Sequence, residues 1–456
     1  MTQTNSPEAC DIVVAGAVIV TGEGKAIGDG AVAVTGTRIV AVGETRAVDA
    51  AYTAARRIDA KGKILMPGLV NVHNHTPLTI VRGMVEDLGF APAYTPGIPQ
   101  GHWLSDEETY LFARLGAWEL LRMGTTTAVD YYRKPQACAA ALAETGLRGF
   151  VGGRIHDADT AALADGAWTH DRKLGEATLA ESQAMIAAWD GKADGRIRCF
   201  HAPHAPDTCS RDLLRIVADL AATDGRQVHT HLAQSPMEVE RVTAREGKGS
   251  AQLLDEIGLL NGDLVAAHCI FLNDAEIDLV GKAGINVAHA PVGNVSAGMI
   301  APIVALEKAG ATIAICTDTK TGDMFESMRT ALAVARVRGA GYACDARTVF
   351  GWATKGGAKA MAMEGEIGVL KPGAKADFIL LDTAAPNLRP IVDGIGIVVH
   401  SGVGPNVSTS VIDGKVVMEN GKPTLFDADA VIAAAQKAAD RLWARAGRPG
   451  VMMEMV

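Results

Sequence analysis

Histidines whose spacing suits metal binding end an apolar segment early in this chain. His73 and His75 close the segment 63–75, and residues two apart on a β-strand point to the same side of it. Two neutral imidazoles that face the same way can supply the first two ligands of a divalent metal such as Zn²⁺. Taken alone, such a pair is more often a surface accident or two core histidines with structural hydrogen bonds.

Further residues of metal-binding type end later apolar segments. They are His201, His204, His229, His231, His268, His289 and Asp318. For each one, the alternative is a buried histidine with a structural hydrogen bond. As a set they favour a metal site with open positions for chemistry, because so many strand-end positions are hard to ascribe to chance in a chain with 12 histidines.

Alternating strand-like and helix-like segments between residues 64 and 364 would position these side chains. Amphipathic helices with Asp or Ser caps are predicted at 106–123, 211–223 and 250–259. Eight strands are predicted, at 63–75, 125–131, 147–155, 197–203, 227–233, 264–269, 285–291 and 311–318. This order indicates an α/β fold, a (β/α)₈ TIM-type barrel with its chemistry at the carboxyl ends of the strands. A doubly wound open sheet competes, but no Gly-x-Gly-x-x-Gly follows a strand.

Short strands with glycine-rich turns flank this region on both sides. They are predicted at 12–20, 30–34 and 37–42, and again at 376–382, 395–400 and 411–417. Since chain ends commonly lie close together, we expect one small β-sandwich built from both ends. The predicted limits are 1–62 and 366–426 for the sandwich, 63–365 for the barrel, and 427–456 for a terminal helix and tail.

Composition is that of an ordinary globular enzyme, with 48% hydrophobic and 21% charged residues. The net charge of -9 and the absence of a basic, aromatic cluster argue against nucleic acid as a partner. No leader and no apolar run of about 18 residues is found, so we expect a cytoplasmic protein without membrane contact. The seven scattered cysteines are typical of buried free thiols. We also expect a homo-oligomer.

Four motifs together resemble the amidohydrolase superfamily over nearly the whole chain. They are Pro67-Gly68-Leu69-Val70-Asn71-Val72-His73-Asn74-His75, His229-Thr230-His231-Leu232-Ala233, Ala267-His268-Cys269 and Cys316-Thr317-Asp318. The subgroup most similar to the chain contains s-triazine hydrolases and S-adenosylhomocysteine or guanine-type deaminases.

This resemblance implies a metal site and its chemistry. One ion would be held by His73, His75, His231 and Asp318, with Zn²⁺ expected and Fe²⁺, Mn²⁺ or Co²⁺ left open. A single ion is expected because the fourth strand has no lysine that could be carboxylated to bridge two. Asp318 and His268 would be the catalytic residues, Asp318 as proton carrier and His268 as a contact to water or substrate. His204, His268 and His289 would line the substrate pocket.

One departure from the subgroup decides the predicted reaction. Its deaminases carry a glutamate where this chain has Gln234, and an amide cannot protonate a ring nitrogen. The Pro-rich loop 90–103 also indicates an apolar, aromatic pocket wall. We therefore expect hydrolysis of a carbon–nitrogen bond in a small neutral amide, urea or (thio)carbamate, similar to that of phenylurea and molinate hydrolases. Gln234 would hydrogen-bond the substrate.

Two alternatives stay open. The first is an aminohydrolase or dechlorinase that acts on a nitrogen heteroaromatic ring such as a triazine, purine or pterin. The second is a non-catalytic metal-binding barrel, which a missing ligand would favour, and none is missing from the motifs.

Overall fold

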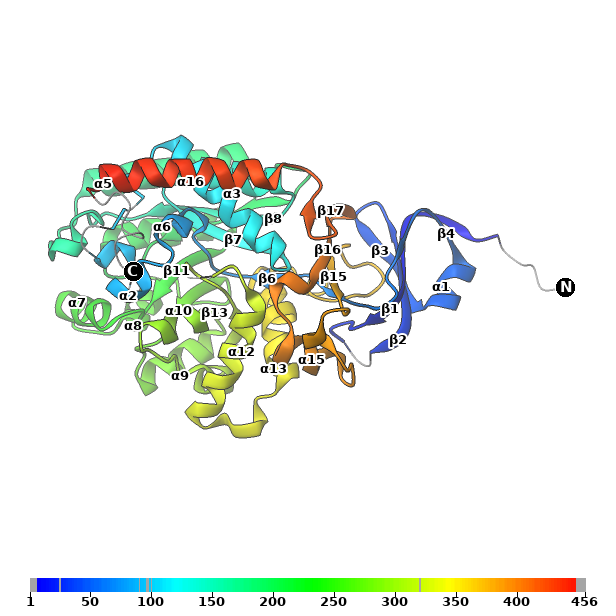
Figure 1. Cartoon of the computed structure of the whole chain (residues 1–456). Coiled ribbons are helices and arrows are strands. Elements are labelled where there is room, and N and C mark those ends of the chain that lie inside the picture. Colours follow the sequence, from blue (N-terminus) through cyan, green and yellow to red (C-terminus); the bar gives the residue numbers. More distant parts are fainter. Residues whose placement is uncertain are drawn as a thin grey trace.

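The structure is a computed structural model, and it describes residues 6–23, 26–89, 91–95, 98–99, 101–319 and 321–447. A barrel surrounded by helices occupies one end of the molecule, and a β-sandwich formed from both ends of the chain occupies the other (Figure 1). The expected fold class is confirmed. In the described part of the chain, no helix has the length and apolar character that a membrane crossing requires.

The barrel strands lie in two parallel sheets that meet edge to edge. One has the order β10-β8-β7-β6 with β9 against β8, and the other β11-β12-β13-β14. Their bounds are β6 Leu69–Asn71, β7 Thr125–Tyr132, β8 Arg148–Ile155, β9 Ile197–Cys199, β10 Ala202–Pro203, β11 Val228–Leu232, β12 Leu264–His268, β13 Asn286–His289 and β14 Thr312–Ile315. The fourth strand is therefore divided into two short pieces.

Helices cover the outside of the barrel, and α16 runs along its upper surface in Figure 1. Serine, asparagine and aspartate side chains cap many of them; Ser105, for example, forms a capping box with Glu108 at the start of α3. The helices here are α2 Val85–Leu88, α3 Asp106–Arg122, α4 Pro135–Thr145, α5 Arg172–Trp189, α6 Arg211–Asp224, α7 Pro236–Glu246, α8 Ser250–Glu256, α9 Asp274–Ala283, α10 Pro291–Ser296, α11 Ile303–Ala309, α12 Met324–Ala335, α13 Ala346–Gly351, α14 Gly357–Ala360 and α16 Ala428–Arg445.

The strands of the sandwich form one sheet with the order β18-β17-β16-β15-β5-β1-β2-β3, and β4 pairs with β1. Its bounds are β1 Glu8–Ile19, β2 Ile27–Thr35, β3 Arg38–Glu44, β4 Tyr52–Asp59, β5 Lys63–Pro67, β15 Phe378–Asp382, β16 Val407–Ile412, β17 Lys415–Glu419 and β18 Lys422–Pro423, with α1 Thr45–Ala51 beside them. A core that includes Ile19, Leu65 and Phe378 joins residues from the two chain ends.

The apolar segment that carries the first two histidines is not one strand. It breaks at Pro67-Gly68, so that β5 pairs with β15 in the sandwich while β6 pairs with β7 in the barrel. A side chain at Gly68 would collide with Thr126, because its Cβ would lie 2.0 Å from the threonine oxygen. The Pro-Gly step therefore carries the chain from one sheet into the next.

Two expectations for the second half of the sandwich are wrong in detail. Residues 395–400 form α15 Gly394–Ser401 and not a strand, because Asp393 caps it by accepting hydrogen bonds from the backbone of Ile395 and Gly396. Residues 411–417 are two strands, β16 and β17, separated by Asp413-Gly414 with φ of +50° and +75°. This is the dipeptide that favours a tight hairpin turn.

Polar side chains close the barrel where β6 meets the end of β14. The Nδ2 atoms of Asn71 and Asn74 lie 2.7 and 2.8 Å from Oγ1 of Thr317. The backbone amide of Thr317 donates to Oδ1 of Asn71 at 3.2 Å. Just beyond, the Asp318 amide donates to the carbonyl of His73 at 3.0 Å. This seam holds the first and last strands in one register.

A buried ion cluster joins the barrel to the sandwich. Arg148, at the start of β8, donates to both carboxylate oxygens of Asp377 at 2.8 and 3.1 Å and to Asp413 at 3.0 Å. Lys375 also reaches Asp413 at 3.0 Å. All three charged groups at the centre are at most 4% exposed. Loss of the arginine would leave buried carboxylates without their main partner.

We therefore expect Arg148→Met to lower the free energy of unfolding by about 3–5 kcal/mol, the usual effect of breaking a buried pair by removing one partner. Denaturant unfolding followed by circular dichroism measures it. Arg172→Met is the matched control, because Arg172 and its partner Glu176 are 92% and 62% exposed. An equal, small effect in both variants would contradict a structural role for the cluster.

Candidate functional site

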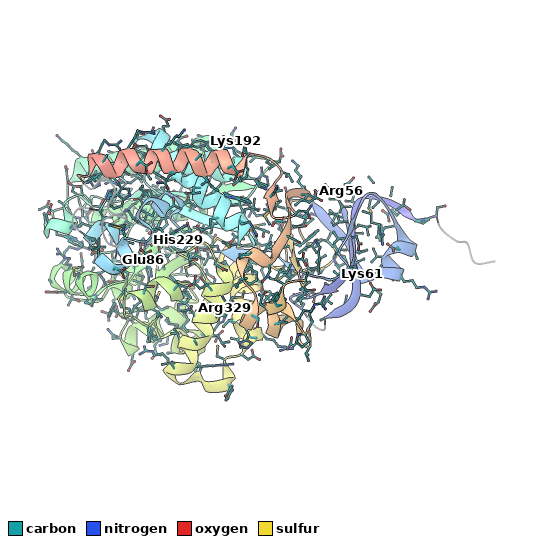
Figure 2. The ribbon with its side chains drawn as sticks, viewed as in Figure 1. Arg56, Lys61, Glu86, Lys192, His229 and Arg329 are labelled. Atoms are coloured by element: carbon teal, nitrogen blue, oxygen red, sulfur yellow. The ribbon has the colours of Figure 1, made fainter. Side chains whose placement is uncertain are left out.

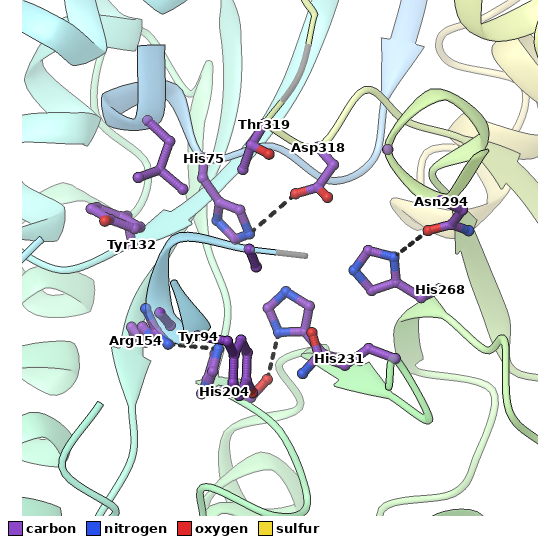
Figure 3. A pocket seen from close by; sticks show the side chains of 15 residues that line it. His75, Tyr94, Tyr132, Arg154, His204, His231, His268, Asn294, Asp318 and Thr319 are labelled. Atoms are coloured by element: carbon purple, nitrogen blue, oxygen red, sulfur yellow. Dashed lines mark hydrogen bonds and ion pairs between the residues drawn. The ribbon is translucent and has the colours of Figure 1, made fainter. Parts of the chain in front are cut away.

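The side chains that the sequence singles out meet at the carboxyl ends of the barrel strands. Six of these side chains, those of His75, His204, His231, Gln234, His268 and Asp318, line a cavity together with residues from neighbouring loops (Figure 3). The lining consists of His75, Leu78, Ala91, Ala93, Tyr94, Tyr132, Arg154, His204, His231, Gln234, His268, Gly293, Asn294, Asp318 and Thr319. His73 lies directly beside the lining residue His75, with ring centroids 4.7 Å apart.

Two overlapping groups of side chains have the geometry of a metal site. His73, His75 and Asp318 bring one ligand atom each within 4.8 Å of one another, and so do His73, His231 and His268. Oδ1 of Asp318 lies 3.7 Å from Nε2 of His73 and 3.6 Å from Nε2 of His75. The sequence placed these residues on the first, fifth, sixth and eighth strands, and the closed barrel brings their ends together.

Hydrogen bonds hold the imidazoles with Nε2 toward the centre. Nδ1 of His75 donates to the backbone carbonyl of Tyr131 at 2.6 Å, and Nδ1 of His231 donates to that of His204 at 2.7 Å. A carbonyl only accepts, so each Nδ1 carries the proton and each Nε2 keeps its lone pair. The Tyr131 hydroxyl also contacts Nδ1 of His231.

His73 is supported by a second histidine beneath it. Its Nδ1 lies 2.9 Å from Nε2 of His229, which lies inside the barrel (Figure 2). Nε2 of His73 is buried and has no hydrogen-bond partner among the described residues. A buried lone pair without a partner is costly in a protein, whereas it is the arrangement that a metal ligand requires.

Burial keeps these rings neutral. It lowers the pKa of His73 and His231 well below the usual value and that of His75 to about 4, although Asp318 acts in the opposite direction on His75. Neighbouring imidazoles lower the pKa of His73 further. Neutral imidazoles and one carboxylate are ligands that Zn²⁺ prefers, so the residues present fit a zinc ion.

The two residues expected to be catalytic have backbone conformations that are rare outside glycine. φ is +75° at His268 and +57° at Asp318. Such strain persists only where the surrounding structure imposes it, and it clusters at functional sites. At Asp318 the closing seam imposes it. At His268, Nδ1 donates a hydrogen bond to Oδ1 of Asn294 at 3.0 Å, and this leaves Nε2 facing the cavity.

His204 lines the cavity as expected, but both of its ring nitrogens already have partners. Nε2 lies 2.6 Å from Nη2 of Arg154, and Nδ1 lies 2.7 Å from Oγ1 of Thr208. Because arginine only donates, Nε2 is the acceptor and Nδ1 bears the proton. His204 and the guanidinium of Arg154 therefore line the cavity as a hydrogen-bonded pair.

Gln234 lies in the cavity wall just after β11. Its backbone amide and that of Ala233 donate to the two carboxylate oxygens of Glu238, at 2.9 and 2.7 Å. Glu238 thus caps the turn and is not among the lining residues. The Gln234 side chain is 4% exposed, and its Nε2 has no hydrogen-bond partner among the described residues.

The cavity has an excess of unpaired hydrogen-bond donors. Three buried nitrogens of lining residues have no partner in the described part of the chain: Nε of Arg154, Nε2 of Gln234 and Nδ2 of Asn294. Asp318 is the one carboxylate in the described lining. Since a buried donor without a partner is unfavourable, the matching ligand is one with several acceptor atoms.

His289 is placed differently from the other predicted residues. It is buried at the end of β13, where burial and the neighbouring His268 lower the pKa of the His289 ring to about 3, but it is not part of the cavity lining. Its expected contact with substrate stays a prediction. Of the loop 90–103, Ala91, Ala93 and Tyr94 line the cavity and give it the expected apolar and aromatic wall, while residues 90, 96, 97 and 100 lie outside the described part.

Sequence reasoning missed four supporting residues. His229 was noted at a strand end without a role, and Tyr131, Arg154 and Asn294 were not noted. The signal for Arg154 was available, because a charged residue interrupts the apolar end of the third strand. Tyr131 and Asn294 carry no such signal, since their roles depend on partners from other strands.

Comparisons with known proteins agree with this geometry. The sequence model of the amidohydrolase family matches residues 64–417. A 5'-deoxyadenosine deaminase of Methanosarcina acetivorans is 35% identical over 448 residues, which cover 96% of this chain and 99% of the relative. A 5-methylthioadenosine/S-adenosylhomocysteine deaminase of Pelotomaculum thermopropionicum is 35% identical over 442 residues, covering 95% and 99%.

Solved structures resemble the whole molecule. An adenosine deaminase from Xanthomonas campestris with bound zinc superposes with a TM-score of 0.86 at 29% identity, covering 96% of this chain and all of the other (100%). Atrazine chlorohydrolase from Arthrobacter aurescens TC1, complexed with zinc, shares the fold with a TM-score of 0.83 at 22% identity, covering 94% and 100%. The chain therefore belongs to the amidohydrolase family, in the subgroup that contains these nucleoside deaminases, and it is a hydrolase of carbon–nitrogen bonds other than peptide bonds.

Proposed function

We propose that the protein is a metal-dependent aminohydrolase that removes the amino group from the adenine ring of a nucleoside such as 5'-deoxyadenosine. The observation that carries the proposal is a set of three donors in the cavity wall, on Arg154, Gln234 and Asn294, that have no partner within the described ranges. An adenine ring offers several acceptor nitrogens around its amino group, whereas a simple amide or urea offers a single carbonyl oxygen. The two relatives described above are deaminases of adenine nucleosides, and their similarity over nearly the whole chain supports the same substrate class.

The proposed reaction is the ring deamination that the sequence left as an alternative, and not the hydrolysis of an acyclic compound that the sequence favoured. Gln234 favoured an acyclic amide, urea or carbamate, because it cannot act as a ring acid. Full-length similarity to purine nucleoside deaminases supports the ring aminohydrolase, which was the alternative. Gln234 can still activate a ring by donating a hydrogen bond to the nitrogen next to the reacting carbon, with less assistance than full proton transfer would give.

His73, His75, His231 and Asp318 would hold the metal ion. When bound, a zinc ion supplies Lewis acidity that makes a water molecule nucleophilic at neutral pH. Asp318 is the proton carrier: its carboxylate can accept a proton from the attacking water and deliver it to the leaving amine. His268 can orient that water, since Asn294 leaves its Nε2 as an acceptor facing the cavity. The buried wall excludes other water molecules.

The substrate class is tested by measuring ammonia release on a panel of compounds with the metal-reconstituted protein. We expect turnover of 5'-deoxyadenosine, methylthioadenosine or S-adenosylhomocysteine, with the 6-amino group replaced by oxygen. Phenylureas, anilides, carbamates and triazines complete the panel. Efficient hydrolysis of a urea or carbamate without any nucleoside deamination would contradict the proposal.

The metal site is tested by elemental analysis together with a variant. We expect about one equivalent of metal per chain, lost with activity on chelation. Asp318→Asn should lower kcat by at least about 10²-fold, the usual scale of proton-transfer catalysis, even when its metal content is matched to wild type. Asp429→Asn, on the exposed face of α16, is the control. Two equivalents in active enzyme would exclude the mononuclear site, and a metal-loaded Asp318→Asn with normal turnover would exclude Asp318 as the proton carrier.

The Gln234→Glu variant distinguishes deamination of an adenine ring from hydrolysis of an acyclic amide. If the substrate is an adenine ring, a carboxyl group at this position can supply the missing acid, and we expect kcat/KM for the nucleoside to rise by about 10-fold or more. If the substrate is an acyclic amide, the added charge next to the metal should instead lower kcat/KM by about 10-fold. Gln436→Glu, an exposed amide on α16, should change neither value.

A further inference from the structure

We propose that Asn294 is a specificity-determining residue that donates a hydrogen bond to N7 of the adenine ring, and that it couples recognition of the base to the position of His268. The inference rests on the proposed function, because it assigns one acceptor of that substrate to one donor of the cavity. None of the four sequence motifs includes Asn294, and its side chain reaches the cavity from α10, beyond the seventh strand.

The amide of Asn294 has one occupied end and one unoccupied end. Its Oδ1 lies 3.0 Å from Nδ1 of His268, and Figure 3 shows the pair on one side of the cavity. Its Nδ2 is buried and has no hydrogen-bond partner among the described residues. The side chain is 1% exposed, so bulk water does not satisfy the donor. The hydrogen bond to His268 fixes which end of the amide stays unpaired.

The order of strands places a second unpaired amide on the other side of His268. Gln234 follows β11, His268 ends β12, and Asn294 follows β13, and these three strands are neighbours in the sheet. A substrate whose reacting carbon faces His268 therefore has one amide donor on each side. Both amides are nine-tenths or more buried, so their positions are set by the structure and not by solvent.

Adenine has the complementary arrangement of acceptors. The carbon that bears its amino group, C6, lies between N1 on one side and N7 on the other, and both nitrogens have a lone pair in the ring plane. In the proposed function, Gln234 donates to the nitrogen next to the reacting carbon, which is N1. Asn294 then pairs with N7. A simple amide or urea has no second acceptor at this spacing.

The pairing makes a specific prediction about base analogues. Replacing N7 by a C–H group removes the acceptor, leaves the buried donor unpaired, and should lower kcat/KM by roughly 10- to 100-fold relative to the parent nucleoside. The change also alters the intrinsic reactivity of the ring. The decisive quantity is therefore the ratio of kcat/KM for 5'-deoxyadenosine to that for its 7-deaza analogue, compared between wild type and variant.

Asn294→Asp removes only the proposed hydrogen bond to N7, because a carboxylate still accepts a hydrogen bond from His268 but cannot donate one. We expect its parent-to-analogue ratio to fall by at least about 10-fold relative to wild type, chiefly through loss of activity on the parent. Asn294→Leu removes both interactions and should lower the ratio similarly, with a further loss of kcat on both compounds. Ser296→Ala, on the exposed face of the same helix, should leave the ratio unchanged.

The outcomes separate this inference from the proposed function. Wild-type enzyme that deaminates no adenine nucleoside refutes the proposed function. Wild-type enzyme that deaminates 5'-deoxyadenosine and its 7-deaza analogue with equal kcat/KM refutes the role of Asn294 while the function stands. The same holds if the ratio is large but unchanged in Asn294→Asp and in Asn294→Leu, because discrimination then arises from another residue.

Discussion

Closure of the barrel between its first and last strands is the constraint on which the site depends. β6 is three residues long and pairs with β7 on one side only, so its other edge relies on hydrogen bonds from Asn71 and Asn74 to Thr317. The next residue is Asp318, in a left-handed conformation, with its amide on the carbonyl of His73. Metal ligands from the first and the last barrel strand must meet within a few Å. Directional hydrogen bonds in a polar seam fix this geometry better than apolar packing, which has no preferred direction.

Burial of several imidazoles at one place is the second condition, and it has an electrostatic consequence. A cationic histidine is unfavourable both in an apolar interior and next to other histidines, so the rings stay neutral. Each neutral ring has one N–H, on Nδ1 or Nε2, that needs a hydrogen-bond acceptor. The backbone carbonyls of Tyr131 and His204 are two such acceptors. Each carbonyl belongs to a different strand from the ring it holds. The ring orientations are therefore properties of the assembled barrel.

Donors dominate the wall above these rings, and this imbalance connects the fold to the reaction. Arg154, Gln234 and Asn294 each have a buried donor without a partner among the described residues, an unfavourable arrangement that a ligand with acceptors relieves. Glu238, the nearest buried carboxyl group in sequence to Gln234, is already engaged by two backbone amides. The amide of Gln234 is thus the polar group that the turn after β11 presents to the cavity. In the proposed aminohydrolase reaction, a hydrogen bond from Gln234 would replace part of the effect of ring protonation.

The sequence alone determined the fold class, the sandwich from both chain ends, and the histidines and the aspartate that line the cavity, because strand periodicity and strand-end position are local properties. It misjudged residues 395–400, where an apolar run reads equally as strand or helix and the Asp393 cap decided. It also treated residues 63–75 as one strand, although Pro67-Gly68 divides them between two sheets. Only the tertiary structure decided the contacts of His73 with His229, of His204 with Arg154 and of His268 with Asn294, because each joins residues from different βα units. Their spacing in sequence carries no information about which ring nitrogen is bonded, and that choice sets the chemistry of the site.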